Sequence, residues 1–184
     1  MAKGALVLVV GPSGAGKDTL LKAAARELAG DSRFNFPRRV VTRTAIAELE
    51  DHDSIDPGQF RTQKLRGAYA LDWDAHGLSY GVPASIDAML VAGRIVVVNT
   101  SRKIVARAVE KYPRCLVLLV TARPEVRAAR LATRGRETEA VIAARLAHEG
   151  EPPPAGVEPM VIDNSGALDT GIAAFVTSLR RIAD

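Results

Sequence analysis

The sequence predicts an α/β fold in which helices cover both faces of a parallel β-sheet. Short apolar runs rich in Val, Ile and Leu alternate with longer segments of helical period, which is typical of strands joined by crossover helices. The chain has 184 residues, of which 47% are hydrophobic, enough for one substantial core. The first apolar run leads through a glycine-rich loop into a helical segment. These observations favour a single three-layer α/β domain over residues 1–184.

The five apolar runs are the expected strands of the parallel sheet. They cover residues 5–10, 39–42, 94–98, 115–120 and 159–162. Helices are expected over residues 17–28, 102–111, 124–134 and 166–182. Pro124 suits the first turn of its helix, where its missing N–H has no partner, and Gly135 suits the end of that helix.

Residues 43–93 interrupt this alternation with shorter signals, two glycine-containing turns and one small helix over 57–66. The segment is interpreted as a small insertion into the α/β pattern. Near the C-terminus, the stretch "EPPPAG" at 151–156 is expected to form a stiff connector before the last strand.

The glycine-rich loop carries the strongest functional signal. Gly11, Gly16 and Lys17 fit the pattern G-x-x-x-x-G-K between a strand and a helix, which is the context of a loop that binds nucleoside triphosphates. Its backbone N–H groups surround the β-phosphate, and Lys17 reaches between the β- and γ-phosphates. The predicted ATP-binding residues here are Gly11, Ser13, Gly14, Ala15, Gly16, Lys17, Asp18 and Thr19.

Asp18 stands where this motif ends in a Ser or Thr that binds magnesium. Thr19 does not simply replace that hydroxyl, because one residue along a helix turns the side chain by about 100°. The strand 94–98 also ends at Asn99 instead of the aspartate that often helps to hold magnesium. Asp18 is therefore predicted to restore the missing charge and bind Mg²⁺, directly or through water. The alternative is that Asp18 only complements the helix dipole.

Arginines recur along the segment 123–134 at intervals of four, three and four residues. This spacing places Arg123, Arg127, Arg130 and Arg134 along one helical face. Such a stripe is also typical of a solvated charged face. Because Arg136 and Arg145 follow it, residues 134–150 are predicted to form a lid that closes over the phosphates. In this interpretation Lys17, Asp18, Arg134 and Arg145 are the catalytic residues.

Several function classes are disfavoured by composition. No apolar run has the length of a membrane span or the flanks of a secretory signal, so a cytoplasmic protein is expected. The single cysteine, Cys115, lies in an apolar run and is expected to be a buried structural thiol. The three histidines are scattered, which argues against a zinc site or a catalytic triad. The arginines form neither a basic tail nor a pattern with aromatic residues, so no nucleic-acid partner is expected.

Beyond the loop, short motifs resemble the guanylate-kinase-like P-loop family, in order, over nearly the whole chain. They are "GPSGAGKDTL", "VTR" at 41–43, "GLSYGVP" at 77–83, "RLATRGRE" at 130–137, "ARL" at 144–146 and "VIDNSG" at 161–166. The sequence departs from true guanylate kinases in the acceptor pocket. A second arginine is missing near Ile46, a tyrosine is replaced by "DSI", and "NTSR" replaces the acids that end the third core strand. Losing carboxylates that pair with guanine weakens guanine binding.

Asp18, "VVVNTSR" and "LSYGV" resemble instead the ribose 1,5-bisphosphate phosphokinases of bacterial phosphonate breakdown. The resemblance implies transfer of the γ-phosphoryl group of ATP, with Mg²⁺, to the 1-phosphate of ribose 1,5-bisphosphate. It implies that Arg130, Arg134 and Arg145 close the lid and that Asn164 lies near adenine. It also implies that acceptor phosphates are held by Arg43, Tyr80 and Arg102, and Asp72 is retained from the acceptor-side pattern.

Two other functions stay open at this point. A guanylate or other nucleoside monophosphate kinase could read a base through Asp72 and the acids Glu48, Glu50 and Asp51. A catalytically silent protein-binding module of the same fold would have no need of the loop lysine or the arginines. The expected partner is a small sugar bisphosphate, and the sequence leaves a monomer and a homodimer equally open.

Overall fold

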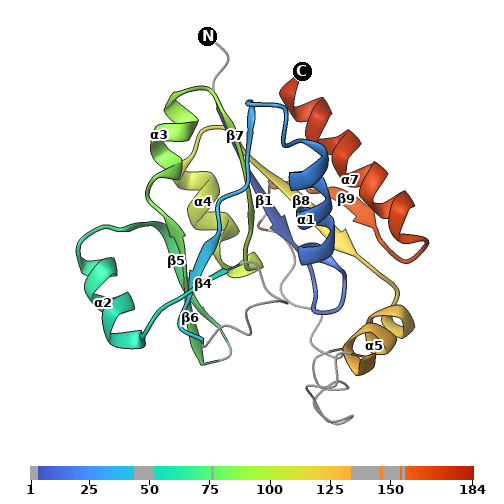
Figure 1. Ribbon diagram of the computed structural model, residues 1–184, viewed down its shortest axis with the longest axis horizontal. Helices are drawn as coiled ribbons and strands as arrows, with labels where there is room; N and C mark the ends of the chain where they lie inside the picture. The colour runs from blue at the N-terminus through green and yellow to red at the C-terminus, as the bar shows by residue number, and fades with distance from the viewer. Residues whose placement is uncertain (1–3, 44–51, 76, 134–145, 147–153, 155) are drawn as a thin grey trace.

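The computed structural model describes residues 4–43, 52–75, 77–133, 146, 154 and 156–184. Its centre is a five-stranded parallel sheet in the order β2-β7-β1-β8-β9 (Figure 1). The strands of this sheet are β1 (Ala5–Val10), β2 (Phe34–Asn35), β7 (Ile95–Asn99), β8 (Cys115–Thr121) and β9 (Met160–Asp163). The predicted parallel α/β fold is confirmed.

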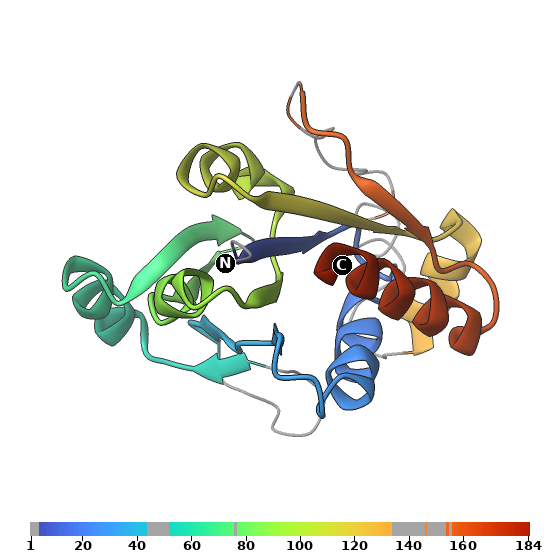
Figure 2. The same cartoon turned by 90° about the horizontal axis from the view of Figure 1, so that it is seen from above.

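Helices cover both faces of this sheet, as Figure 2 shows with α1 and α7 on one side and α4 on the other. The long helices are α1 (Lys17–Glu27), α5 (Pro124–Thr133) and α7 (Leu168–Ala183). The shorter ones are α2 (Pro57–Leu65), α3 (Ile86–Val91), the 3₁₀ turn η1 (Arg102–Ile104) and α4 (Val105–Lys111). The helix predicted over 102–111 thus begins as a 3₁₀ turn.

Strand β1 explains why the first apolar run is continuous rather than alternating. Its six residues are all buried. Val7 and Val9 pack in a core that includes Leu20 of α1 and Phe175 of α7. Leu6 and Leu8 face the opposite core, which includes residues of η1, α3 and α4. A strand buried on both faces needs apolar side chains at every position, and it holds the loop that follows it in a fixed place.

A second, four-stranded sheet corrects one prediction. It has the order β4-β3-β6-β5 and consists of β3 (Arg39–Val41), β4 (His52–Ser54), β5 (Tyr69–Ala75) and β6 (Leu78–Pro83). The expectation that the 39–42 strand belongs to the central parallel sheet is wrong, because β3 pairs antiparallel with β6. The short strand β2 takes the place beside β7 instead.

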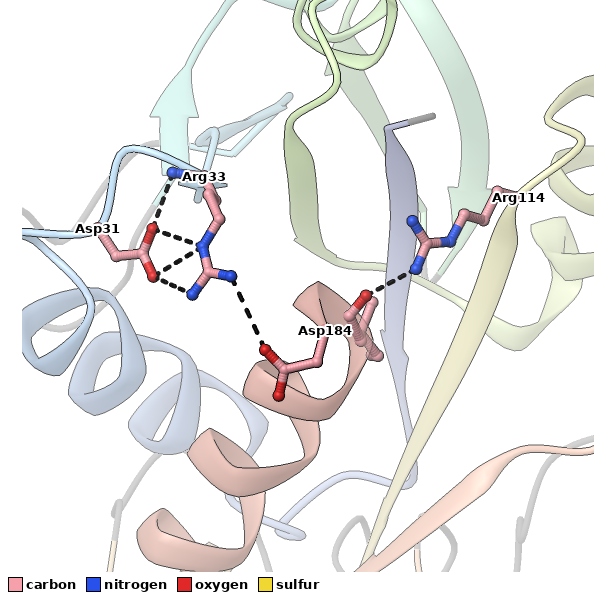
Figure 3. A network of polar contacts seen from close by, with 5 residues as sticks. Asp31, Arg33, Arg114 and Asp184 are labelled. Atoms are coloured by element: carbon pink, nitrogen blue, oxygen red, sulfur yellow. Dashed lines mark hydrogen bonds and ion pairs between the residues drawn. The ribbon is translucent and has the colours of Figure 1, made fainter. Parts of the chain in front are cut away.

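The end of α7 is tied to the rest of the domain by a polar network (Figure 3). Arg33 donates to both carboxylate oxygens of Asp31, at 3.0 Å from Nε and 2.8 Å from Nη2, and pairs with Asp184 at 3.9 Å. Arg114 donates to the carbonyl oxygen of Ile182 at 2.6 Å. The hydrogen bonds from Arg33 lower the pKa of Asp31. The exposed ion pairs of Arg33 add little free energy. The part-buried hydrogen bond from Arg114 connects the end of α7 to the residue before β8.

Cys115 at the start of β8 is half-buried, and burial raises the pKa of its thiol to about 11. The thiolate fraction at pH 8 should therefore be about two orders of magnitude below that of an ordinary cysteine. We expect a thiol reagent such as DTNB to modify the folded protein correspondingly slowly at pH 8 and at an ordinary rate in denaturant. Fast stoichiometric modification of the folded protein would contradict a structural role for this cysteine.

Candidate active site

The glycine-rich loop leaves β1 at the carboxyl edge of the parallel sheet, between the neighbouring strands β7 and β8. This edge is where ligands bind in open α/β sheets. Gly14 and Gly16 have φ angles of 81° and 93°, which disfavour any other residue. A Cβ at Gly14 would lie 2.9 Å from the carbonyl oxygen of Arg127, and a Cβ at Gly16 would lie 2.4 Å from Nδ2 of Asn164. Both glycines are required by the backbone conformation and by close neighbours.

Lys17, the first residue of α1, folds back over the loop. Its Nζ donates to the carbonyl oxygens of Gly11 at 2.6 Å and Pro12 at 3.0 Å. The ammonium group therefore joins the helix end of the loop to its strand end. A cation in this position and several loop N–H groups together form a site suited to a polyphosphate.

Asp18 lies beside the end of β7. Asn99, the last residue of that strand, donates from Nδ2 to Asp18 Oδ1 at 2.6 Å. Arg39 of β3 approaches the same oxygen at 3.7 Å. The three side chains line a small cavity of about 30 Å³. The carboxylate of Asp18 thus lies next to Asn99, the position at the end of β7 where the more common aspartate is absent.

Helix α5 and the end of β9 hold the outer side of the loop. Arg127 donates from Nε to the carbonyl oxygen of Ser13 at 3.0 Å. Arg130 donates from Nη2 to the carbonyl oxygen of Asn164 at 2.9 Å and approaches that of Ala15 at 3.4 Å. The buried side chain of Asn164 donates from Nδ2 to Ala15 at 2.8 Å. Arg130 and Asn164, predicted to bind ATP, therefore bind the backbone of the loop here.

A pocket of about 440 Å³ opens next to Arg130 and Asn164. Its lining residues come from the loop, α1, α5, the residue after β9 and the start of α7, and they are Gly16, Thr19, Ala129, Arg130, Thr133, Asn164 and Leu168. The pocket is large enough for a nucleotide base and ribose, and it adjoins the predicted phosphate site at Gly16.

The predicted acceptor residues lie around the second sheet. Tyr80 of β6 stacks on Trp73 of β5 with ring centroids 5.2 Å apart and an interplanar angle of 5°. Arg43 is exposed just after β3, and Arg102 is half-buried at the start of η1. Asp72 forms ion pairs with Lys64 and with Arg107, the latter at 3.2 Å. The stacking of Tyr80 agrees with a packing role, and its contact with an acceptor stays a prediction.

The pKa of His52 in β4 is affected by the positive charges around the second sheet. The imidazole is buried, and its pKa is lowered first by burial and then by the charges of Arg43, Arg39 and Arg38. His52 is therefore neutral near pH 7, which is consistent with an arginine-rich surface suited to phosphate groups.

Some predicted residues lie outside the described part of the chain. They are the predicted lid over 134–150, apart from residue 146, with Arg134 and Arg145, and the acids Glu48, Glu50 and Asp51. In the remainder, no cluster of three or more His, Cys, Asp or Glu side chains could hold a metal ion. Among the same described residues, no helix has the length and apolar character that crossing a membrane requires.

Gly171 packs closely against the side chain of Asn164. It lies inside α7, and a Cβ there would be 2.2 Å from Oδ1 of Asn164. Replacing a helical glycine by alanine usually stabilises a protein. We expect Gly171→Ala to cost about 1–3 kcal/mol of unfolding free energy instead, as overpacking does, and to weaken ATP binding because Asn164 must move.

Thermal unfolding and ATP titration check this prediction, with Gly166→Ala as the matched control. Gly166 lies close by in the chain and has open space at its Cβ position. A Gly171→Ala protein that is more stable than the unmodified chain would show that the packing around Asn164 is loose.

Comparison with solved structures supports the same fold. A guanylate kinase from Anaplasma phagocytophilum superposes with a TM-score of 0.71 at 16% identity, over 98% of this chain and 87% of that one. At this identity the likeness establishes the fold alone.

Sequence comparison is more specific. No protein-family model matches the chain. A ribose 1,5-bisphosphate phosphokinase PhnN of Acidiphilium cryptum is 51% identical over 98% of this chain and 95% of that protein. The protein of the same name from Brucella melitensis is 45% identical over 98% of this chain and 94% of its own length. The chain therefore belongs to the ribose 1,5-bisphosphate phosphokinase family.

Proposed function

We propose that this protein transfers the γ-phosphoryl group of ATP to the 1-phosphate of α-D-ribose 1,5-bisphosphate, giving 5-phosphoribosyl 1-diphosphate and ADP, in phosphonate catabolism. The observation that carries the proposal is the 51% identity to a ribose 1,5-bisphosphate phosphokinase over nearly the full length of both chains. The geometry of the loop supports a triphosphate as donor.

The residues at the loop fit ATP as the donor substrate. The positive φ angles of Gly14 and Gly16 and the absence of a Cβ at both allow the backbone to approach a phosphate closely. Lys17 supplies a cation at the same loop. The neighbouring pocket of about 440 Å³ has room for adenine and ribose beside Asn164.

The donor set also fits magnesium. Mg²⁺ is commonly held by one or two carboxylates together with substrate phosphates and water, and Asp18 offers one such carboxylate beside Asn99. When bound, the ion would neutralise charge on the β- and γ-phosphates. Asp18 would hold it directly or through water, and Asn99 would orient the carboxylate.

The reaction needs positioning more than proton transfer. An oxygen of the acceptor 1-phosphate forms a bond to the γ-phosphorus, and the bond from that phosphorus to the β–γ bridging oxygen breaks, so that ADP leaves. The attacking oxygen is already anionic and no general base is required. Lys17 would stabilise charge on the transferring group, while Arg134 and Arg145 would close over it.

The acceptor side favours a sugar bisphosphate over a nucleotide base. Asn99-Thr-Ser stands at the end of β7, where a guanine pocket has acids, and Asp72 forms ion pairs with Lys64 and Arg107. We propose that Arg43, Tyr80 and Arg102 bind acceptor phosphates, with Asp72 holding the surrounding cations in place.

The test offers ribose 1,5-bisphosphate and GMP separately, at equal concentration, with ATP and Mg²⁺, and measures ADP formation. We expect turnover with the sugar bisphosphate and little or none with GMP. Turnover with GMP alone would instead support a nucleoside monophosphate kinase. A silent binding module would give neither turnover nor a rise in melting temperature with ATP and Mg²⁺.

A further inference from the structure

Arg127 is a buried cation that the proposed chemistry does not yet use. It lies in the middle of α5 and is 3% exposed. Its Nε donates to the carbonyl oxygen of Ser13, while its Nη2 is buried without a hydrogen-bond partner. In the part of the chain that the structure describes, no carboxylate forms an ion pair with it. A buried charge without a counter-charge is costly in an isolated protein.

The neighbouring arginines, Arg123 just before this helix and Arg130 within it, are in a different situation. Arg123 is exposed and pairs with Glu125 at 3.4 Å. Arg130 is only half-buried and has backbone carbonyl groups on both of its terminal nitrogens. Arg127 alone of these three is both buried and without a second partner.

The position of Arg127 suggests what balances its charge. A Cβ built on Gly14 would lie 3.1 Å from the Cα and from the Cβ of Arg127. The backbone of Arg127 therefore packs directly on the phosphate-binding loop, and its guanidinium holds the Ser13 carbonyl. In such a loop the N–H groups that bind phosphate turn inward. Arg127 thus lies behind the loop, with one layer of backbone between it and the predicted phosphates.

We infer that Arg127 is a positioning residue whose buried charge is balanced by the polyphosphate bound on the other side of the loop. The inference rests on the proposed function only in that a nucleoside triphosphate binds there. Interactions across a low-dielectric layer of protein are stronger than the same interactions in water. The charge of Arg127 should therefore strengthen binding in proportion to the number of phosphates, while adding nothing to the stability of the free protein.

Two substitutions separate the charge from the hydrogen bond. Arg127→Gln can keep a donor for the Ser13 carbonyl but has no charge, whereas Arg127→Lys keeps the charge but lacks the planar fork. Both are polar, and the amide nitrogen of Gln stands at the same distance along the side chain as Nε of Arg. The matched controls are Arg123→Gln and Arg123→Lys, at the exposed residue just before the start of α5. Calorimetric titration measures the Kd of ATP, ADP and AMP, and thermal unfolding measures the free protein.

We expect Arg127→Gln to weaken ATP binding by about tenfold or more, the range for a lost charge-assisted interaction. The loss should be smaller for ADP and smallest for AMP, and the KM for ATP should rise while the KM of the acceptor is unchanged. Arg127→Lys should keep most of the discrimination between ATP and AMP. The free Arg127→Gln protein should melt at or above the temperature of the unmodified chain.

A purely structural role would give the opposite results. Arg127→Gln would then keep its ATP affinity, or would lose stability in the free protein and bind ATP and AMP equally less well. Either result would overturn the inference. The proposed acceptor is tested separately: a protein that binds ATP in this manner yet does not phosphorylate ribose 1,5-bisphosphate would refute the proposed function and leave the role of Arg127 standing.

Discussion

Lys17→Met should reduce kcat for phosphoryl transfer by at least about 100-fold, the scale found when one preorganised charge is removed from a developing anion. In the structure its ammonium group spans the loop, from α1 back to the carbonyl oxygens of Gly11 and Pro12. Methionine keeps most of the length of the side chain and removes the charge together with the two hydrogen bonds to these carbonyl oxygens. The measurement is steady-state ADP formation at saturating ATP and acceptor.

Lys22→Met is the matched control, because Lys22 lies on the same helix outside the loop. We expect it to retain nearly full activity, and both proteins to melt within a few degrees of the unmodified chain. A tenfold loss of kcat corresponds to only about 1.4 kcal/mol in the activation free energy. If Lys17→Met kept more than about a tenth of kcat, this lysine would not act on the transferring group.

Asp18→Ala should lower turnover at low magnesium by roughly 10- to 100-fold, the range for groups that hold or orient a metal, and high magnesium should restore part of the loss. The expectation follows from the contact between Asp18 and Asn99 at 2.6 Å, at the end of β7, where the more common metal-binding aspartate is absent. The measurement is turnover as a function of free Mg²⁺ at fixed ATP.

Glu27→Ala at the exposed end of the same helix is the control, and it should leave the magnesium dependence unchanged. A second variant, Asn99→Asp, places an acid in the more common position. We expect Asn99→Asp to recover part of the magnesium affinity when combined with Asp18→Ala. Identical magnesium curves for Asp18→Ala and the unmodified chain would reduce Asp18 to a residue that complements the helix dipole.

The elements that the sequence predicted well are those whose local signals agree with their packing. Strand β1 is apolar at each position because both of its faces are buried, and the loop after it has glycines where the backbone demands them. The helix beginning at Pro124 follows from local chemistry of the same kind. In these segments neighbouring residues contain nearly all the information.

The second sheet could not be predicted from local sequence signals. Strand β3 looks like one more apolar run, and only its pairing with β6, which lies about 40 residues away in the chain, shows which sheet it joins. Local sequence signals are also insufficient to predict parts of the candidate site. The spacing predicts a stripe of arginines. It does not predict that Arg127 is buried behind the loop, because that position depends on long-range contacts with Ser13 and Gly14. The family resemblance predicts Asn164 near adenine, and the structure adds that its amide donates to the carbonyl oxygen of Ala15.

The most direct test of the proposed function is a phosphorus NMR spectrum of the reaction of ribose 1,5-bisphosphate with ATP and Mg²⁺. We predict that the 1-phosphate signal of the sugar is replaced by two mutually coupled diphosphate signals while the 5-phosphate signal stays a monophosphate and ADP accumulates in equal amount. Unchanged sugar signals, or a new diphosphate only when GMP replaces the sugar, would contradict the function proposed for this protein.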